Sequence, residues 1–302
     1  MPVIISQMAV LFVLLAVGYT AGKAKTLTSE GAKTLSKVVL FIATPCTILN
    51  SVMSGAVRIS GGDTLFYLLM AFVVFFIAFL VAIPAARALC KGPDRGLYCY
   101  MCVFGNVTFM GLPVSYAIFG PVSAFYVALL NIPFMLFSFS VGIYLIAGKN
   151  SKFNPMNFLN PSLIAALISI PIAVTGLGFP VILTNAIGII GNMTTPGAML
   201  VIGATLSKIA FADVFKQWRL YPLTVFKLVV TPVVTWLVLR VFIIDELMLG
   251  VLVVLSGMPV AAASAMFALE YGGNEKVASS GVFLSTLLSG ATIPLLVFLL
   301  LR

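Results

Sequence analysis

The sequence predicts an all-α membrane protein that crosses the bilayer about ten times as two inverted five-helix repeats. Three observations lead to this fold class. Hydrophobic residues make up 62% of the 302 residues and charged residues only 8%, whereas a soluble domain carries about 25% charged residues. Apolar runs of about the length of a membrane-spanning helix follow one another along the chain. Short proline motifs in the first half recur in the second half.

The first five apolar runs make up the first repeat. The first run lacks a basic N-terminal region, so we interpret it as a membrane helix and not as a cleaved signal peptide. The fourth and fifth runs contain Gly, Asn or Pro near their middle. A helix bundle tolerates such residues where neighbours satisfy the freed backbone groups or where these groups line a cavity. The five runs cover residues 2–22, 31–53, 63–88, 97–119 and 122–147.

The second half of the chain continues in the same way. We divide the chain into a first repeat over residues 1–147, a short linker over 148–159 and a second repeat over 160–302. Because each repeat has an odd number of helices, the two must insert in opposite orientations. The runs of the second repeat cover residues 160–177, 180–207, 219–241, 246–270 and 276–301.

Two motifs recur about half a chain apart and in the same order. Inverted repeats with Gly and Pro interruptions at corresponding positions are typical of secondary transporters, whose broken helices meet near the bilayer midplane. We therefore expect breaks at the motif prolines Pro45 and Pro196 and at Gly105. The matched segments are Ala43–Leu49 with Thr194–Leu200, and Gly111-Leu112-Pro113-Val114 with Gly257-Met258-Pro259-Val260.

Lys and Arg residues concentrate in the connections after the first, third, fifth, seventh and ninth runs. The positive-inside rule places these connections in the cytoplasm and both termini outside it. The basic residues assigned to the cytoplasmic side are Lys23, Lys25, Lys33, Lys37, Arg87, Lys91, Arg95, Lys149, Lys152, Lys208, Lys216, Arg219 and Lys276, against Arg58, Arg240 and Arg302 on the other side.

The fourth run holds the main candidate for a ligand site. Gly105, Gly111 and Pro113 disfavour a regular helix there, and Asn106 brings an amide that needs a partner. We interpret this stretch as an unwound crossover, in which a half-helix N-terminus presents N–H groups and a partial positive charge to an anion. A kinked helix whose Asn106 bonds a neighbour is the alternative. Because the ninth run repeats the pattern, we favour the crossover.

A few other polar residues lie inside apolar runs. We expect Asn131 and Thr286 to face the bundle interior, where they contact a ligand or hold helices together. Lys227 is the only basic residue well inside a run; it either acts as a fixed cation, attracting an anion or replacing a coupling cation, or snorkels to the cytoplasmic end of its helix. The complete set of candidate binding residues is Thr47, Asn106, Val107, Gly111, Pro113, Asn131, Lys227, Gly257, Met258, Pro259, Val260 and Thr286.

The composition also excludes several functions. The eight acidic residues lie in connections or at run ends, so the buried carboxylate of most proton- and sodium-driven carriers is missing. There is no histidine, no Walker A motif and no catalytic triad, so we expect neither an enzyme nor a cofactor.

Cys99 and Cys102 lack further metal ligands and are interpreted as packing residues. The basic residues form no stripe with interleaved aromatics, which excludes nucleic-acid binding.

These motifs resemble those of the auxin efflux carrier family, which includes plant PIN proteins and short bacterial carriers. The resemblance runs through nearly the whole chain. It is carried by Leu40-Phe41-Ile42-Ala43-Thr44-Pro45, by Asn106 with Met110-Gly111-Leu112-Pro113 and Gly120, by Asn160-Pro161, and by Pro259 with Ala268-Leu269-Glu270-Tyr271.

The resemblance implies that helices 4 and 9 cross and that a transport domain moves against a scaffold domain by an elevator mechanism. By position, Asn106 corresponds to the family's substrate-binding asparagine, and Asn131 is expected in the same pocket. A homodimer through the scaffold domain is also implied. Where plant members have a proline in helix 9, this chain has Ser264, so Ser264 and Pro259 are both considered as break positions.

From these points we expect a carrier that exports a small organic anion, such as an auxin-like compound or a mono- or dicarboxylate, by potential-driven uniport across a bacterial inner membrane. Its partners would be this anion and membrane lipid. Two alternatives stay open: a proton- or sodium-coupled importer of dicarboxylates such as malonate or malate, and a membrane receptor that binds a ligand without moving it.

Overall fold

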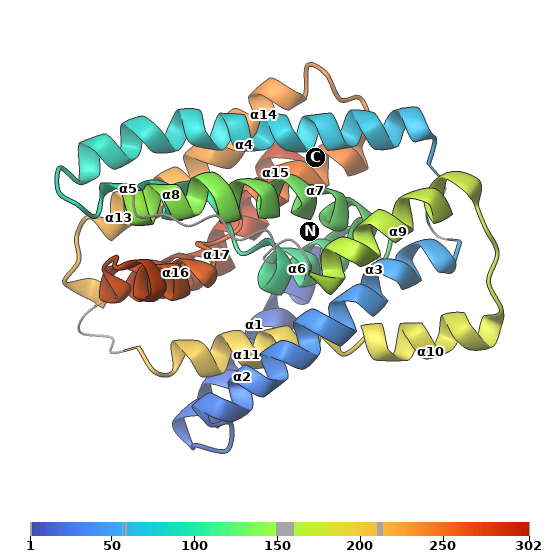
Figure 1. Cartoon of the computed structure of the whole chain (residues 1–302), viewed down its shortest axis with the longest axis horizontal. Helices are drawn as coiled ribbons and strands as arrows, with labels where there is room; N and C mark the ends of the chain where they lie inside the picture. Colours follow the sequence, from blue (N-terminus) through green and yellow to red (C-terminus); the bar gives the residue numbers. More distant parts are fainter. Residues whose placement is uncertain (1, 56, 58, 149–159, 210–213, 302) are drawn as a thin grey trace. The chain divides into compact units, whose positions relative to one another are not determined.

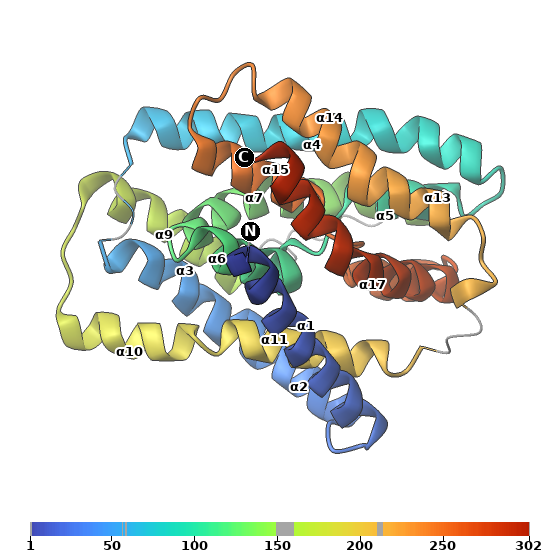
Figure 2. The same cartoon turned by 180° about the vertical axis from the view of Figure 1, so that it is seen from behind.

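The structure is a computed structural model that describes residues 2–55, 57, 59–148, 160–209 and 214–301. Within these residues the regular elements are helices (Figures 1 and 2), so the predicted all-α fold class is confirmed. Seven helical segments of this part of the chain are long and apolar enough to cross a membrane, as expected of a polytopic membrane protein. They are Ile5–Lys23, Ser29–Met53, Gly61–Leu89, Ser123–Ala147, Val181–Leu206, Leu220–Leu239 and Glu275–Leu300.

The other three predicted runs are helical but short or interrupted. The run 160–177 holds α9 (Pro161–Thr175), and the runs 97–119 and 246–270 each divide into two helices. These are α5 (Arg95–Val103) with α6 (Leu112–Phe119), and α15 (Glu246–Ser256) with α16 (Ala263–Tyr271).

The remaining helices follow the predicted runs closely. They are α1 (Pro2–Lys23), α2 (Ser29–Val38), α3 (Thr44–Met53), α4 (Gly61–Leu89), α7 (Ser123–Phe137), α8 (Ile143–Ala147), α10 (Val181–Gly191), α11 (Thr194–Leu206), α13 (Leu220–Val225), α14 (Thr231–Leu239) and α17 (Glu275–Leu300). In the described part of the chain, four π-helical turns lie next to some of these helices: η1 (Val39–Ala43), η2 (Val107–Gly111), η3 (Ser138–Gly142) and η6 (Phe226–Val230).

Several helices begin at polar residues that cap the first free N–H groups. The side chains of Asn160, Asp245 and Asn274 each accept a hydrogen bond from a backbone N–H two or three residues later. Pro161 follows Asn160 at the first helical position, where a missing N–H has no cost. These caps fix the starts of α9, α15 and α17 within the polar connections.

Three of the prolines inside predicted runs are preceded by π-helical turns. Pro45, Pro113 and Pro232 each lie at the second position of the helix that follows η1, η2 or η6. A proline cannot donate a backbone hydrogen bond, and its ring collides with the carbonyl four residues earlier. A π-turn widens the helix by one residue and relieves this collision. The chain is therefore helical through Pro45, where the sequence predicted a break.

The residue contacts divide the chain into two compact units. Each unit combines segments from both halves of the sequence. The predicted linker 148–159 lies outside the described residues except for Gly148. The first unit comprises Met1–Met70, Thr108–Ile132 and Phe158–Lys208, and the second comprises Ala71–Val107, Pro133–Asn157 and Ile209–Arg302.

In the first unit α1 and α11 pack with almost no space between their backbones. A Cβ atom added to Gly203 would lie 2.1 Å from the carbonyl oxygen of Leu15, and one added to Gly18 would lie 2.5 Å from that of Leu200. Glycine at both positions allows this close approach, the usual means by which membrane helices associate without a hydrophobic driving force.

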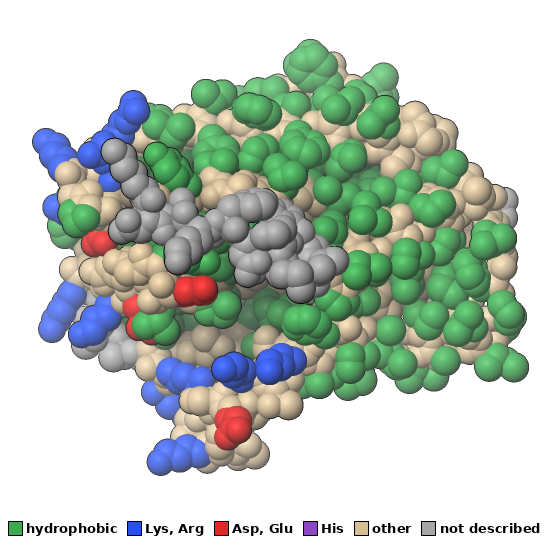
Figure 3. Space-filling model, viewed as in Figure 1, with side chains coloured by type: hydrophobic (Ala, Val, Ile, Leu, Met, Phe, Trp, Pro, Cys, Tyr) green, Lys and Arg blue, Asp and Glu red, His purple; other side chains and the backbone are tan. Residues whose placement is uncertain are grey.

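The surface suits a lipid environment. In Figure 3 hydrophobic side chains cover the long sides of the helices, and Lys and Arg side chains gather where α2 begins and where α4 ends. Large side chains such as Leu80, Ile182 and Val241 are more than 70% exposed. A soluble protein rarely leaves so many apolar side chains in water.

Candidate functional site

In the second unit, both interrupted runs lose helical structure over a few residues. The chain leaves α5 at Phe104, whose backbone is extended, and becomes helical again at Val107. It leaves α15 at Gly257 and becomes helical again at Ala263. The first interruption is therefore confined to residues 104–106, and the second comes before Ser264, which lies in the first turn of α16.

The two interruptions pair with each other as a short antiparallel bridge between Gly105 and Val260. The backbone N–H of Asn106 donates to the carbonyl oxygen of Pro259 at 2.7 Å, and that of Ala261 donates to the carbonyl oxygen of Phe104 at 3.0 Å. Backbone groups that leave a helix inside a membrane need such partners. The two unwound segments thus provide hydrogen-bond partners for each other's backbone groups.

Local sequence explains why the pairing forms at these residues. A Cβ atom on Gly105 would lie 3.1 Å from the Cβ of Met258 and 3.3 Å from Nζ of Lys227, so a larger residue would push the two paired segments apart. Pro259 offers a carbonyl but no N–H. The N–H of Val260 instead donates to Oγ of Ser285 at 3.0 Å.

Lys227 lies next to Gly105 of this bridge and is 1% exposed. Its Nζ donates hydrogen bonds of 3.1 Å to the carbonyl oxygens of Val103 and Ser256. These are the last residues of α5 and α15, whose final carbonyls have no partner within the helix. The structure contradicts snorkelling, because the ammonium group is held inside the unit.

The side chain of Asn106 is 5% exposed. Its amide makes no hydrogen bond with any of the described residues, although its backbone N–H is paired. Nearby, Ala262 precedes α16 and provides no side-chain cap, and the N–H groups of Ala262 and Ala263 have no partner in the described part of the chain. An almost buried amide and free helix-start N–H groups are suitable donors for an anion.

Comparison with known proteins identifies the family. The sequence model of a family described as "Membrane transport protein" matches residues 3–158 and 150–297. The chain belongs to this family. It is the family of the auxin efflux carriers, so the resemblance stated from the motifs is confirmed.

Two archaeal relatives match over nearly their whole length. One, an uncharacterized transporter of Methanocaldococcus jannaschii, is 27% identical over an alignment of 306 positions that covers 97% of each protein. The other, an uncharacterized transporter of Methanothermobacter thermautotrophicus, is 25% identical over 296 residues, which cover 94% of each protein.

For this auxin efflux carrier family member, the structure places the other predicted residues in two groups. In the second unit, Val107 begins η2, Met258 is fully buried at the bridge, and Gly257 packs against Pro232. Thr286 lies on α17 beside Ser285; it is 1% exposed, and its hydroxyl has no hydrogen-bond partner among the described residues.

The remaining candidates lie in the first unit. Gly111 and Pro113 are helical. Asn131 donates from Nδ2 to Oγ1 of Thr108 at 3.2 Å. Thr47 donates from Oγ1 to the carbonyl oxygen of Gly191 at 2.8 Å.

The first proline-motif pair also lies in this unit. Oγ1 of Thr47 is 2.8 Å from Oγ1 of Thr194, so these two segments touch. Pro196 follows Thr194 in the first turn of α11, directly after the turn at Asn192 and Met193 that separates α10 from α11.

The second motif match does not reflect the pairing. The sequence aligned Gly111 with Gly257, but the bridge joins Gly105 to Val260, and Pro113 lies in a helix while Pro259 lies in an interruption. Thr108, the partner of Asn131, was not predicted. It is a polar residue in an apolar run, which is the signal by which it could have been found.

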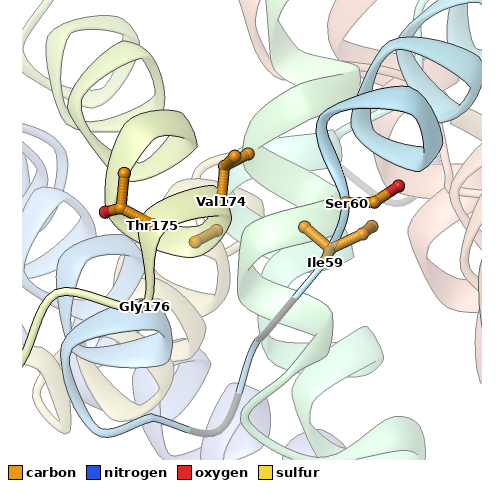
Figure 4. A pocket seen from close by; sticks show the side chains of 6 residues that line it. Ile59, Ser60, Val174, Thr175 and Gly176 are labelled. Atoms are coloured by element: carbon orange, nitrogen blue, oxygen red, sulfur yellow. The ribbon is translucent and has the colours of Figure 1, made fainter.

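An open hollow in the first unit is lined by Ile59, Ser60 and residues 173–176 (Figure 4), and it contains none of the predicted residues. Among the described residues no group of three or more His, Cys, Asp and Glu could hold a metal ion. Cys99 and Cys102 are free and buried.

Proposed function

We propose that this protein is a secondary transporter that carries a small organic anion, such as an auxin-like compound or a mono- or dicarboxylate, out of the cell. The proposal includes ten membrane crossings in two inverted five-helix repeats and an inner-membrane location with both termini outside. Membership in a transport family supports it. The bridge between two interrupted helices supports it further, because such helices are the usual binding elements of secondary transporters.

The Asn106 side chain is the observation that carries the proposal. The residue is 5% exposed, and its amide makes no hydrogen bond with the described residues, so Nδ2 is available as a donor. A ligand carboxylate that accepts from Asn106 Nδ2 would form a charge-assisted hydrogen bond there. The free N–H groups at Ala262 and Ala263 supply further donors, and the partial positive charge at the start of α16 favours an anion.

A potential-driven uniport fits the charges near the bridge. The described residues place no carboxylate against Lys227 or Asn106, so none of them offers a titratable acid for proton coupling at the bridge. For one negative charge leaving a cell with a negative interior, 100 mV contributes about 2.3 kcal/mol. This corresponds to roughly fiftyfold accumulation outside.

An elevator mechanism and a dimer complete the proposal. The unit that contains the bridge would move as the transport domain, and the other unit would serve as the scaffold and as the contact between two copies. The division of the chain into two compact units supports this assignment.

The test is a thermal-shift screen of carboxylates against the purified wild type, Asn106→Ala and a control, Asn192→Ala. Asn192 lies exposed in the turn before α11. At a hundred times its Kd, a ligand stabilises the folded protein by about 2.7 kcal/mol. We expect this shift in the wild type and in Asn192→Ala but not in Asn106→Ala. A ligand that shifts all three equally binds elsewhere.

Counterflow then distinguishes a carrier from a receptor. Proteoliposomes loaded with the unlabelled ligand should transiently accumulate the labelled ligand if the protein exchanges it across the bilayer. A ligand that binds with the expected dependence on Asn106 but shows no counterflow would identify a receptor and contradict the proposal.

A further inference from the structure

We infer that Lys227 occupies an internal cation site formed by the carboxyl ends of α5 and α15, so that its ammonium group replaces a bound metal cation. The inference concerns the same bridge as the proposed function, and only its consequence for coupling rests on that function. The site itself can be tested on the purified protein without any transport.

Two hydrogen bonds and one close backbone approach define the site. Nζ of Lys227 donates 3.1 Å hydrogen bonds to the carbonyl oxygens of Val103 and of Ser256. Gly105 lies on the third side, where a Cβ atom would be 3.3 Å from Nζ. Because the side chain is 1% exposed, water does not screen these interactions as it does at a surface. The described residues include no carboxylate that pairs with Lys227.

The charges of the two helix ends match a single cation. A helix carries a partial charge of about −0.5 at its carboxyl end. The ends of α5 and α15 converge on Nζ, so together they present about one negative charge. One ammonium group neutralises it. Lys227 thus lies where the backbone itself requires a monovalent cation, and this explains a buried lysine without an acidic partner.

Unwound carbonyls and half-helix carboxyl ends are also the groups that coordinate sodium in secondary transporters. In this protein a covalently attached cation fills that position. No ion has to bind before the bridge is stable, and none can be released during a transport cycle. Transport of the anion is then independent of a sodium gradient.

Replacing Lys227 should therefore uncover a cation site. Lys227→Ser removes the charge, leaves space and adds a hydroxyl oxygen to the two carbonyls, whereas Lys227→Met removes the charge but fills the space with an apolar chain. Lys216→Ser is the matched control, because Lys216 is an exposed lysine of the same unit. Melting temperatures are measured in sodium chloride and in N-methylglucamine chloride at equal ionic strength.

We expect the wild type and Lys216→Ser to melt at the same temperature in both salts. In N-methylglucamine chloride, Lys227→Ser should melt roughly 5–10 °C lower than the wild type and should recover most of this loss in sodium chloride. Lys227→Met should melt lower in both salts. A packing role alone would give no recovery with sodium.

Three results would overturn the inference: a Lys227→Met variant that melts like the wild type, a Lys227→Ser variant that responds equally to both salts, or a wild type stabilised by sodium. If Lys227→Ser yields no folded protein in N-methylglucamine, its yield of monodisperse protein in sodium chloride or methylammonium chloride is the readout. Failure with both of these cations also overturns it. None of these measurements depends on whether the wild type carries an anion, so the two proposals fail separately.

Discussion

The backbone N–H of Asn106 donates to the carbonyl oxygen of Pro259 across 2.7 Å, joining two segments that lie half a chain apart in the sequence. Together with the bond from the N–H of Ala261 to the carbonyl oxygen of Phe104, this bond holds the backbone that carries the Asn106 side chain. The geometry of the proposed binding residue therefore depends on the second half of the chain as much as on the first.

Gly105→Ala should weaken this pairing. The added Cβ would press against Met258 and Nζ of Lys227 at 3.1 and 3.3 Å, and overpacking of this kind costs about 1–3 kcal/mol. We expect a lower melting temperature in detergent and weaker ligand binding. Gly178→Ala is the control, because nothing lies within 4 Å of its Cβ position. Equal melting of the two variants would show that the bridge accommodates a methyl group.

Thr47→Val should destabilise the first unit. The hydroxyl of Thr47 bonds the carbonyl of Gly191 and contacts Oγ1 of Thr194, both at 2.8 Å, and a valine leaves these groups unpaired at a cost of about 1–2 kcal/mol. Thr175→Val removes a similar hydroxyl from an exposed position and should cost about 0.5 kcal/mol or less. Unfolding in denaturing detergent measures both, and a Thr47→Val cost no larger than that of Thr175→Val would contradict the expectation.

Gly203→Ala should disrupt the packing of α1 against α11. Its Cβ would lie 2.1 Å from a backbone carbonyl oxygen. A backbone atom cannot relieve this clash by a rotamer change, as a side chain can. We expect a loss of about 3 kcal/mol or failure to fold, seen as aggregation in gel filtration. Gly61→Ala, where the added atom meets nothing within 4 Å, should elute as the wild type does.

Transport should follow the membrane potential. In proteoliposomes, a potassium gradient with valinomycin sets the voltage while pH and sodium stay equal on both sides. For a monovalent anion we expect accumulation on the positive side, roughly fiftyfold at 100 mV. Accumulation that needs a sodium or pH gradient at zero voltage would identify a coupled carrier instead.

The orientation can be tested by labelling single cysteines in a variant that lacks the four native ones. Arg240→Cys should react with an impermeant maleimide in intact cells, and Lys91→Cys only after lysis, because the distribution of basic residues places these connections on opposite sides. Both residues are exposed. The reverse pattern would invert the predicted topology.

The sequence was sufficient to predict the helical fold class and the interruptions at Gly105 and Pro259. Glycine, proline and polar residues are unfavourable in the middle of a membrane helix, so their positions indicate where a helix is interrupted. The effect of Pro45 could not be predicted in this way. A proline breaks a helix unless the preceding turn widens and a neighbour takes the freed carbonyl. Here Oγ of Ser162, far along the chain, donates to the carbonyl oxygen of Leu40.

The environment of Lys227 also could not be predicted from the sequence. A lysine eight residues inside an apolar run has the same sequence context whether it snorkels or stays buried. Its burial depends on the carboxyl ends of two helices from other parts of the chain, at Val103 and Ser256. Periodicity and composition describe one segment at a time and carry no information on where two ends converge.

The π-turns also constrain how this chain can change in length. Each amounts to one additional residue in an otherwise regular helix. Because that residue is taken up within the turn, deleting one residue from η1 would restore an ordinary helical turn and leave the residues after it on nearly the same faces. A deletion within the regular helix α3 has no additional residue to remove and would rotate everything after it by about 100°. A single-residue deletion in these helices should therefore change the facing of later side chains less at a π-turn than in the regular helix beyond it.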